Sequence, residues 1–190
     1  MKILILQFSN IAMVKRVLMS LILIMGIITV YSQNVERLES EPTFKGITIG
    51  MPINSIANKL SFDSVVNGDT MYNLTDSQYY SVFGISMNHA RVVVRNGKVY
   101  MILLVKTVQG SESNPTIFDA SELQTIERGL IERFGRPTQP IYKKGEVYTT
   151  GSQWNSKTKA VGVYMDFYGT FNGYMLVFSM GEGVERKVDF

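Results

Sequence analysis

The amino-acid sequence predicts an α+β fold, in which a single antiparallel sheet of about six strands carries two helices packed on one face. Three observations support this prediction. Apolar residues recur with helical spacing in two segments, apolar and polar residues alternate in several others, and an Asn-Gly pair stands between two apolar runs. Of the 190 residues, 45% are hydrophobic and 18% charged, which excludes a disordered or collagen-like chain.

The first helix is expected after the turn-forming residues 50–52 (Gly-Met-Pro). Ile53, Ile56 and Leu60 are spaced like one face of a helix. Proline is tolerated in the first helical turn, because the backbone N–H that proline lacks would have no hydrogen-bond partner within the helix there. The preceding segment, 44–50, is expected to be a short strand.

The next segments are less regular. Residues 61–77 (SFDSVVNGDTMYNLTDS) are rich in turn-forming residues, so we expect mostly loop, with one short strand near Val65. Residues 79–87 are expected to form a strand of the sheet, beside the hairpin that follows.

Asn96-Gly97 predicts a two-residue hairpin turn. Both residues of a type I′ turn have positive φ, which Asn and Gly tolerate best. The turn also sets the pairing of the two strands. The predicted pairs on one face are Val94 with Val99 and Val92 with Met101.

The second helix is expected to end before Gly135 and Pro137, which terminate helices. Its predicted apolar side consists of Leu123, Ile126, Leu130, Ile131 and Phe134. Three antiparallel strands are expected afterwards, at 147–155, 160–168 and 173–180. The predicted core-facing row of the middle strand consists of Val161, Val163, Met165 and Phe167.

The N-terminal residues have the pattern of a secretory signal peptide. Lys15 and Arg16 precede an apolar segment, 17–30, of 14 residues, which is shorter than the roughly 20 residues that span a bilayer. We expect a signal peptide at 1–32, with Met1 or Met13 as the true start. A retained membrane anchor is the alternative. A flexible lead-in at 33–43 and a single domain at 44–190 are expected to follow.

The charge balance changes if this signal is removed. Three of the 19 basic residues and none of the 16 acidic residues lie in 1–32, so the remaining chain has a formal net charge of zero. A neutral domain has no electrostatic attraction to nucleic acid or to an anionic membrane. We expect a periplasmic or secreted protein with no nucleic-acid partner and no integral membrane span after cleavage.

Few residues are candidates for catalysis. His89 is the only histidine and there is no cysteine, so a site with several His or Cys ligands is excluded. Asp63, Asp69 and Asp76 share a polar segment, but their spacing does not match a calcium-binding loop. No phosphate-binding glycine motif occurs. We expect no catalytic residue, no metal site and no cofactor.

The candidate binding residues are aromatic. Tyr148 and Trp154 have the same parity on one expected strand, as do Tyr164 and Tyr168 on the next. If the two rows align, the rings form one surface, and exposed Tyr and Trp are typical of recognition surfaces. The alternative is that these rings are core residues under a helix or under the segment 61–77.

Two segments resemble known exported proteins. Residues 44–51 (FKGITIGM), followed by Ile56 and Leu60, resemble the opening of the beta-lactamase inhibitory protein-like group, which includes the small lipoprotein of the outer-membrane assembly machinery. The resemblance implies helices against an antiparallel sheet and a role in binding other proteins. Residues 133–137 (RFGRP), followed by Trp154, are similar to exported proteins of gut Bacteroidetes whose function is uncharacterised.

Two classes of function are therefore expected. The first is a non-catalytic protein-interaction module of the cell envelope, with an envelope or extracellular protein as its partner. The alternative is a small-ligand binder or hydrolase with a pocket near His89 and Asp166, which would require convergent polar groups in a concave site.

Overall fold

The computed structural model describes residues 35–109, 120–143, 147–168 and 173–183. The predicted signal peptide at 1–32 lies outside these residues. In the part of the chain that the structure describes, no helix is both long enough and apolar enough to cross a membrane.

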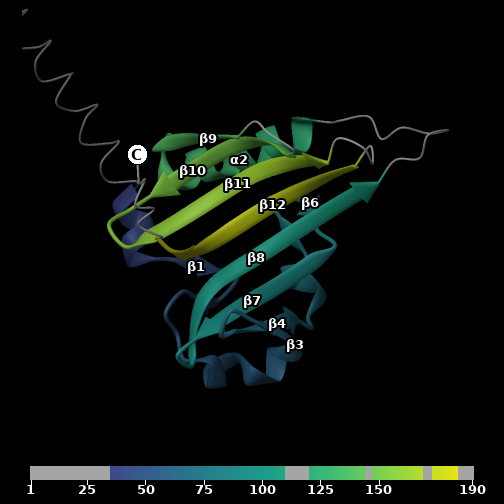
Figure 1. Ribbon diagram of the computed structural model, residues 1–190. Coiled ribbons are helices and arrows are strands. Elements are labelled where there is room, and N and C mark those ends of the chain that lie inside the picture. Colours follow the sequence, from purple (N-terminus) through teal and green to yellow (C-terminus); the bar gives the residue numbers. More distant parts are fainter. Residues whose placement is uncertain (1–34, 110–119, 144–146, 169–172, 184–190) are drawn as a thin grey trace, which may run out of the picture. The chain divides into compact units, whose positions relative to one another are not determined.

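The central feature is an antiparallel sheet of eight strands (Figure 1). Each neighbouring pair runs antiparallel. Across the sheet the strands are β3 (Leu60–Val66), β4 (Asp69–Leu74), β7 (His89–Arg95), β8 (Lys98–Gln109), β12 (Gly173–Glu182), β11 (Lys159–Tyr168), β10 (Val147–Asn155) and β9 (Gln139–Lys143).

Shorter elements surround the sheet. Two hairpins have two-residue strands: β1 (Thr43–Phe44) with β2 (Ile47–Thr48), and β5 (Ser81–Val82) with β6 (Ile85–Ser86). The helices of the described residues are the α-helix α2 (Ala120–Phe134), a helical segment at 35–40, and the 3-10 helices η1 (Ile53–Lys59) and η2 (Ser77–Tyr79).

The predicted fold class is therefore wrong. The described chain is mostly β, with an eight-stranded antiparallel sheet and two short hairpins, and not a single six-stranded sheet with two helices packed on one face. The expected loop at 61–77 contains β3 and β4, and the expected strand at 79–87 contains the β5–β6 hairpin. The strand expected at 44–50 is divided between β1 and β2.

The first expected helix is a 3-10 turn because little of it is buried. Of its residues only Ile56 is buried, and no side chain caps its start at Pro52. A short helix needs tertiary packing to be stable, and a single buried residue provides little packing. At Leu60 the backbone becomes extended (φ −121°, ψ 142°), and the chain enters β3.

Four hairpins turn on the same backbone geometry. In each, the first turn residue has φ of 46–52° and the glycine after it has φ of 73–85°, as a type I′ turn requires. The turns are Lys45-Gly46, Asn67-Gly68, Phe83-Gly84 and Asn96-Gly97. The prediction of a two-residue hairpin at Asn96-Gly97 is confirmed.

The pairing beyond that turn differs from the prediction in one step. Val94 pairs with Val99 as expected, but a register shift follows at once, so Val92 pairs with Ile102 and not with Met101. A bulge places two residues of one strand opposite one of the other. Turn chemistry alone does not predict it.

The C-terminal half follows the sequence analysis closely. The three predicted antiparallel strands are β10, β11 and β12. Helix α2 packs on β10 and β11, and its side chains Leu123, Ile126, Leu130 and Phe134 are buried. Ile131, expected on the same side, is exposed.

Polar contacts also attach α2 to the sheet. Glu122 in its first turn forms an ion pair with Lys106 of β8 and accepts a hydrogen bond from the Tyr174 hydroxyl of β12 at 3.1 Å. In the middle of the helix, Glu127 accepts a hydrogen bond from Ser152 of β10 at 2.6 Å. These bonds satisfy polar groups that the helix covers.

The fold includes residues before the boundary expected at residue 44. Leu38, in the helical segment 35–40, is completely buried. Glu39 accepts hydrogen bonds from Ser156 Oγ (2.7 Å) and from the backbone N–H of Thr158 (2.8 Å). The segment expected to be a flexible lead-in is thus joined to the β10–β11 turn.

We predict that Gly97→Val lowers the free energy of unfolding by about 1 kcal/mol or more, because a β-branched residue resists positive φ. An added Cβ at Gly97 would meet no atom within 4 Å, so the loss would report backbone strain alone. Urea unfolding measures it, with Asn96→Gly, which keeps the positive φ accessible, as the control. Equal stability of Gly97→Val and wild type would contradict the turn.

We predict that Glu39 makes a contribution to the free energy of unfolding that is lost in acid. Hydrogen bonds from Thr158 and Ser156 lower the pKa of its carboxyl from 4.5 to about 2. The stabilisation is therefore present above pH 4.5 and is lost as the pH falls towards 2. Glu39→Gln should lower stability at pH 7 by less than about 1 kcal/mol, because the group is solvent-screened.

Thermal unfolding between pH 2 and 7 measures this contribution. The difference between wild type and Glu39→Gln should shrink on acidification from pH 4.5 to 2. The exposed residue Glu36, in the same helical segment, provides the charge-matched control Glu36→Gln. A difference that is constant over the whole pH range would contradict the prediction.

Candidate functional site

The two faces of the sheet differ in what covers them. In Figure 1, α2 lies behind β10 and β11, on the face that carries the buried rows of these strands. Paired residues of neighbouring strands share a face, so strand register assigns the other side chains to the opposite one. We call this opposite side the helix-free face. Its apolar side chains include Met71, Val93, Met101, Leu103, Val105, Ile141, Tyr164, Met175 and Val177.

The middle of the helix-free face is apolar. Val177 of β12 pairs with Val105 and Tyr164, and its exposed fraction is only 1%. Leu103 and Met175 beside it are half-buried. Antiparallel sheets usually pair a core-facing apolar side with a polar solvent-facing side. Here both sides of the central strands are apolar.

At one end this face carries a hydrogen-bonded polar cluster. Asn73 donates to Asp63 at 3.1 Å and accepts from Arg91 at 3.2 Å, and Ser64 donates to Asp63 at 3.1 Å. The pKa of Asp63 is lowered, chiefly by the hydrogen bond from Asn73 and further by Ser64, Arg91 and His89. The polar groups at this end of the face therefore satisfy one another's hydrogen bonds.

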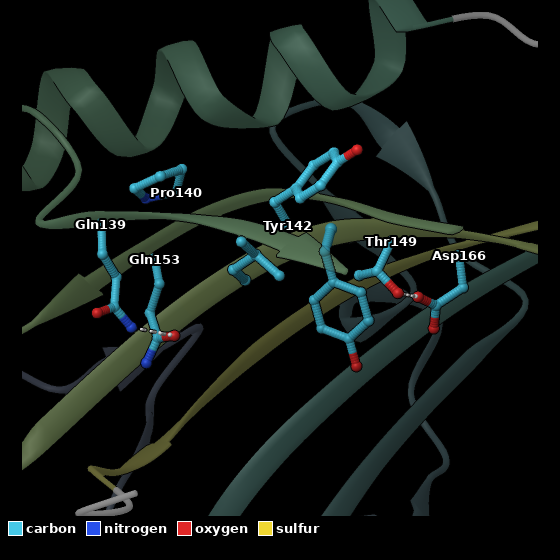
Figure 2. A pocket seen from close by; sticks show the side chains of 8 residues that line it. Gln139, Pro140, Tyr142, Thr149, Gln153 and Asp166 are labelled. Atoms are coloured by element: carbon cyan, nitrogen blue, oxygen red, sulfur yellow. Dashed lines mark hydrogen bonds between the residues drawn. The ribbon is translucent and has the colours of Figure 1, made fainter. Parts of the chain in front are cut away.

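At the other end lies a cavity of about 470 Å³ over β9, β10 and β11 (Figure 2). Gln139 and Gln153 project into the helix-free side, whereas Pro140 and Tyr142 point towards α2. Its lining consists of Gln139, Pro140, Ile141, Tyr142, Thr149, Gln153, Tyr164 and Asp166.

The polar groups of this cavity are held by one another. Thr149 donates to Asp166 Oδ1 at 2.5 Å, and Gln139 donates to Gln153 Oε1 at 3.1 Å (Figure 2). Gln153 in turn donates to Asn155 at 2.7 Å. The amides and the carboxylate are positioned to bind a polar ligand, and the cavity has the size of a small-molecule site.

The structure does not bring His89 and Asp166 together. His89 pairs with Val105, and β8 and β12 lie between β7 and β11. Three strand spacings put the two backbones about 14 Å apart. The pocket expected near both residues therefore contains Asp166 but not His89. No group of three acidic or histidine side chains that could hold a metal ion occurs within the described ranges.

The predicted aromatic surface is divided between the two faces, which corrects the sequence analysis. Trp154 pairs with Val161 and Tyr164 pairs with Gly151, so the two rings point to opposite sides. Trp154 is completely buried, and its indole N–H donates to the Gly135 carbonyl at 2.7 Å. It is a core residue under α2.

Of the other predicted rings, Tyr164 lines the cavity. Tyr148 pairs with Phe167 and Tyr168 pairs with Gly173, but the side chains of Tyr148 and Tyr168 lie outside the described part of the structure. Their role in binding stays a prediction.

Sequence analysis missed the strand that completes the cavity. β9 supplies Gln139 and Ile141, and the sequence analysis assigned no element between the end of the helix at Pro137 and the strand expected at 147–155. Proline is tolerated on an edge strand, where its missing N–H leaves no ladder bond unmade. The one signal in the sequence for Gln153 was its spacing from Thr149, which places both side chains on the same side of β10.

Comparison with known protein families, with curated proteins and with solved structures gives no match. The resemblance to the beta-lactamase inhibitory protein-like group and to exported proteins of gut Bacteroidetes stays a prediction.

We predict that Trp154→Ala lowers the free energy of unfolding by about 3–5 kcal/mol, the usual cost of removing a buried large aromatic ring. Trp154→Phe should recover part of the loss, because the ring returns but the Gly135 carbonyl stays unpaired. Denaturant unfolding measures both. Tyr142→Ala, at a position 66% exposed, is the control and should cost less than about 1 kcal/mol. A loss for Trp154→Ala as small as that of the control would contradict a core role.

Proposed function

We propose that this chain is a non-catalytic protein-binding module of the cell envelope, periplasmic or secreted, and that it binds its partner on the helix-free face. The observation that carries the proposal is the apolar middle of that face. Contiguous apolar surface with a polar rim is typical of interaction sites. Val105 and Val177 are already buried among their neighbours, so the half-buried Leu103, Met175 and Tyr164 would supply the contact area.

The charges of the face indicate what kind of partner fits. Arg91 and Asp63 lie 3.6 Å apart and balance each other at one end. At the other end Asp166 is hydrogen-bonded to Thr149. A nearly neutral face with an apolar middle favours a protein surface that presents apolar or aromatic side chains. The signal-peptide pattern supports a partner in the envelope or outside the cell.

The absence of cysteine from the sequence allows a sharp test. Leu103→Cys and Met175→Cys each create a single thiol on the helix-free face, and Ile131→Cys creates one on the exposed side of α2 as the control. Each variant is labelled with a photo-activated crosslinker and mixed with envelope extract from the native cells. We expect one protein adduct from both face positions and none from Ile131→Cys.

Competition distinguishes specific binding from adventitious capture. Excess unlabelled wild-type protein should abolish the adduct. The double variant Leu103→Glu/Met175→Glu should not compete, while its melting temperature stays close to that of wild type. Adducts that are the same at all three positions, or that resist competition, would refute the proposal.

A small-ligand binder is the second candidate, and the cavity of about 470 Å³ favours it. Its neutral amides and single carboxylate suit a small polar ligand without negative charge. Native mass spectrometry after incubation with the low-molecular-mass fraction of the extract tests this. An adduct lost in Tyr164→Ala would support the second candidate, and no adduct would contradict it.

A further inference from the structure

A second cavity lies on the other side of the sheet, between α2 and the two short hairpins. Its volume is about 210 Å³. Leu130 and Phe134 of α2 and Phe178 and Met180 of β12 line it, and all four are at most 3% exposed. The cavity therefore has an apolar floor that belongs to the core.

The rim of this cavity is formed by less buried residues. Phe83 is 42% exposed, and Lys45 is also exposed. The ring of Phe83 occupies the space beside Gly129 of α2, where an added Cβ would lie 2.4 Å from the ring. Gly129 thus allows Phe83 to form one wall. Lys45 and Phe83 mark where the cavity meets solvent.

Two cations line this apolar cavity without an acidic partner. Among the described carboxylates, none forms a salt bridge with Lys45 or Arg133. Lys45 Nζ donates to the Gln78 carbonyl and to Ser81 Oγ, the latter at 2.9 Å, and Arg133 Nη2 donates to the Thr43 carbonyl at 3.3 Å. Both cations therefore keep donors for an anion.

The environment of these cations makes an anion favourable. Arg133 Nε is buried and has no hydrogen-bond partner in the described structure. Partial burial lowers the pKa of Lys45, although its side chain stays exposed at the rim. An unsatisfied buried donor is unfavourable, and a carboxylate within reach would satisfy it.

Backbone strain is found at the same place. Lys45 (φ 47°) and Phe83 (φ 46°) have positive φ, as do Asn67 and Asn96 at the other two turns. Asn tolerates this region, whereas Lys and Phe rarely adopt it. Strained residues concentrate at functional sites. Both strained side chains line this cavity.

We propose that this cavity binds a small amphipathic acid, with its apolar group over Phe134 and Phe178 and its carboxylate at Arg133 and Lys45. The volume sets the size of the apolar group. A cavity of about 150 Å³ accommodates benzene, so about 210 Å³ takes one substituted ring or a short acyl chain. This site is separate from the helix-free face and does not depend on the proposed partner binding.

Octanoate is the probe for this proposal, measured by isothermal titration calorimetry and by thermal shift in a buffer free of carboxylates. We expect saturable binding of octanoate at one site per chain. Octan-1-ol has the chain without the charge, acetate has the charge without the chain, and octylamine reverses the charge. Each of these three should bind at least fivefold more weakly than octanoate.

Two variants remove the proposed anion contacts separately. Arg133→Gln and Lys45→Gln should each weaken octanoate binding at least fivefold, and Arg133→Lys should restore part of the affinity because it keeps the charge. Arg128→Gln, on the exposed side of α2, is the matched control and should bind like wild type.

The proposal is overturned by any of three results. These are no saturable binding of octanoate, equal binding of octan-1-ol and octanoate, and a loss smaller than fivefold in a folded Arg133→Gln or Lys45→Gln variant. If Arg133→Gln does not fold, Lys45→Gln decides, since Lys45 is exposed on a turn, and within the described residues its amine contacts the Gln78 carbonyl, Ser81 and the Phe44 ring.

Discussion

The hydrogen bond from the Trp154 indole to the Gly135 carbonyl determines how the helix and the sheet fit together. The last carbonyls of a helix have no partner within it. Gly135 (φ 78°) turns the chain away from α2 and donates its own N–H to the Ile131 carbonyl at 2.8 Å. Its buried carbonyl then needs a donor, and Trp154 provides one from the middle of the core. The same ring fixes which side of β10 faces α2.

Once that side is chosen, geometry limits what the helix can cover. A helix about 10 Å wide covers roughly two strand spacings of 4.8 Å, and α2 packs on β10 and β11. The sheet has eight strands, so other elements must cover the rest of this face. The β1–β2 and β5–β6 hairpins lie next to Phe178 and Met180 of β12, and the cavity lined by Arg133 lies where these hairpins meet α2. No described element of comparable length lies on the opposite face.

The local signals in the sequence were reliable for α2, for β10 to β12 and for the turn at Asn96-Gly97, because periodicity and turn chemistry depend on neighbouring residues. The same signals failed where the place of a segment in the fold depends on contacts with residues far away in the sequence. Asn67-Gly68 is the same dipeptide as Asn96-Gly97, yet its hairpin was missed. The flanking strand β3 lies at the sheet edge with Phe62 63% exposed, so it lacks the alternation of a half-buried strand. The prediction of one aromatic surface was wrong for a related reason. Alternation within one strand is a local property, whereas the pairing of Trp154 with Val161 depends on how two strands align.

The four type I′ turns show the same distinction between local and tertiary control. At Asn67 and Asn96 the residue itself favours the turn, so the hairpin forms from local preference. Lys45 and Phe83 have no such preference, and their conformation must be stabilised by tertiary contacts. Phe83 has its contact with Gly129 of α2, and Lys45 its hydrogen bonds to Gln78 and Ser81. Sites where local preference and tertiary structure disagree are where function is expected, and both of these residues line the cavity with Arg133.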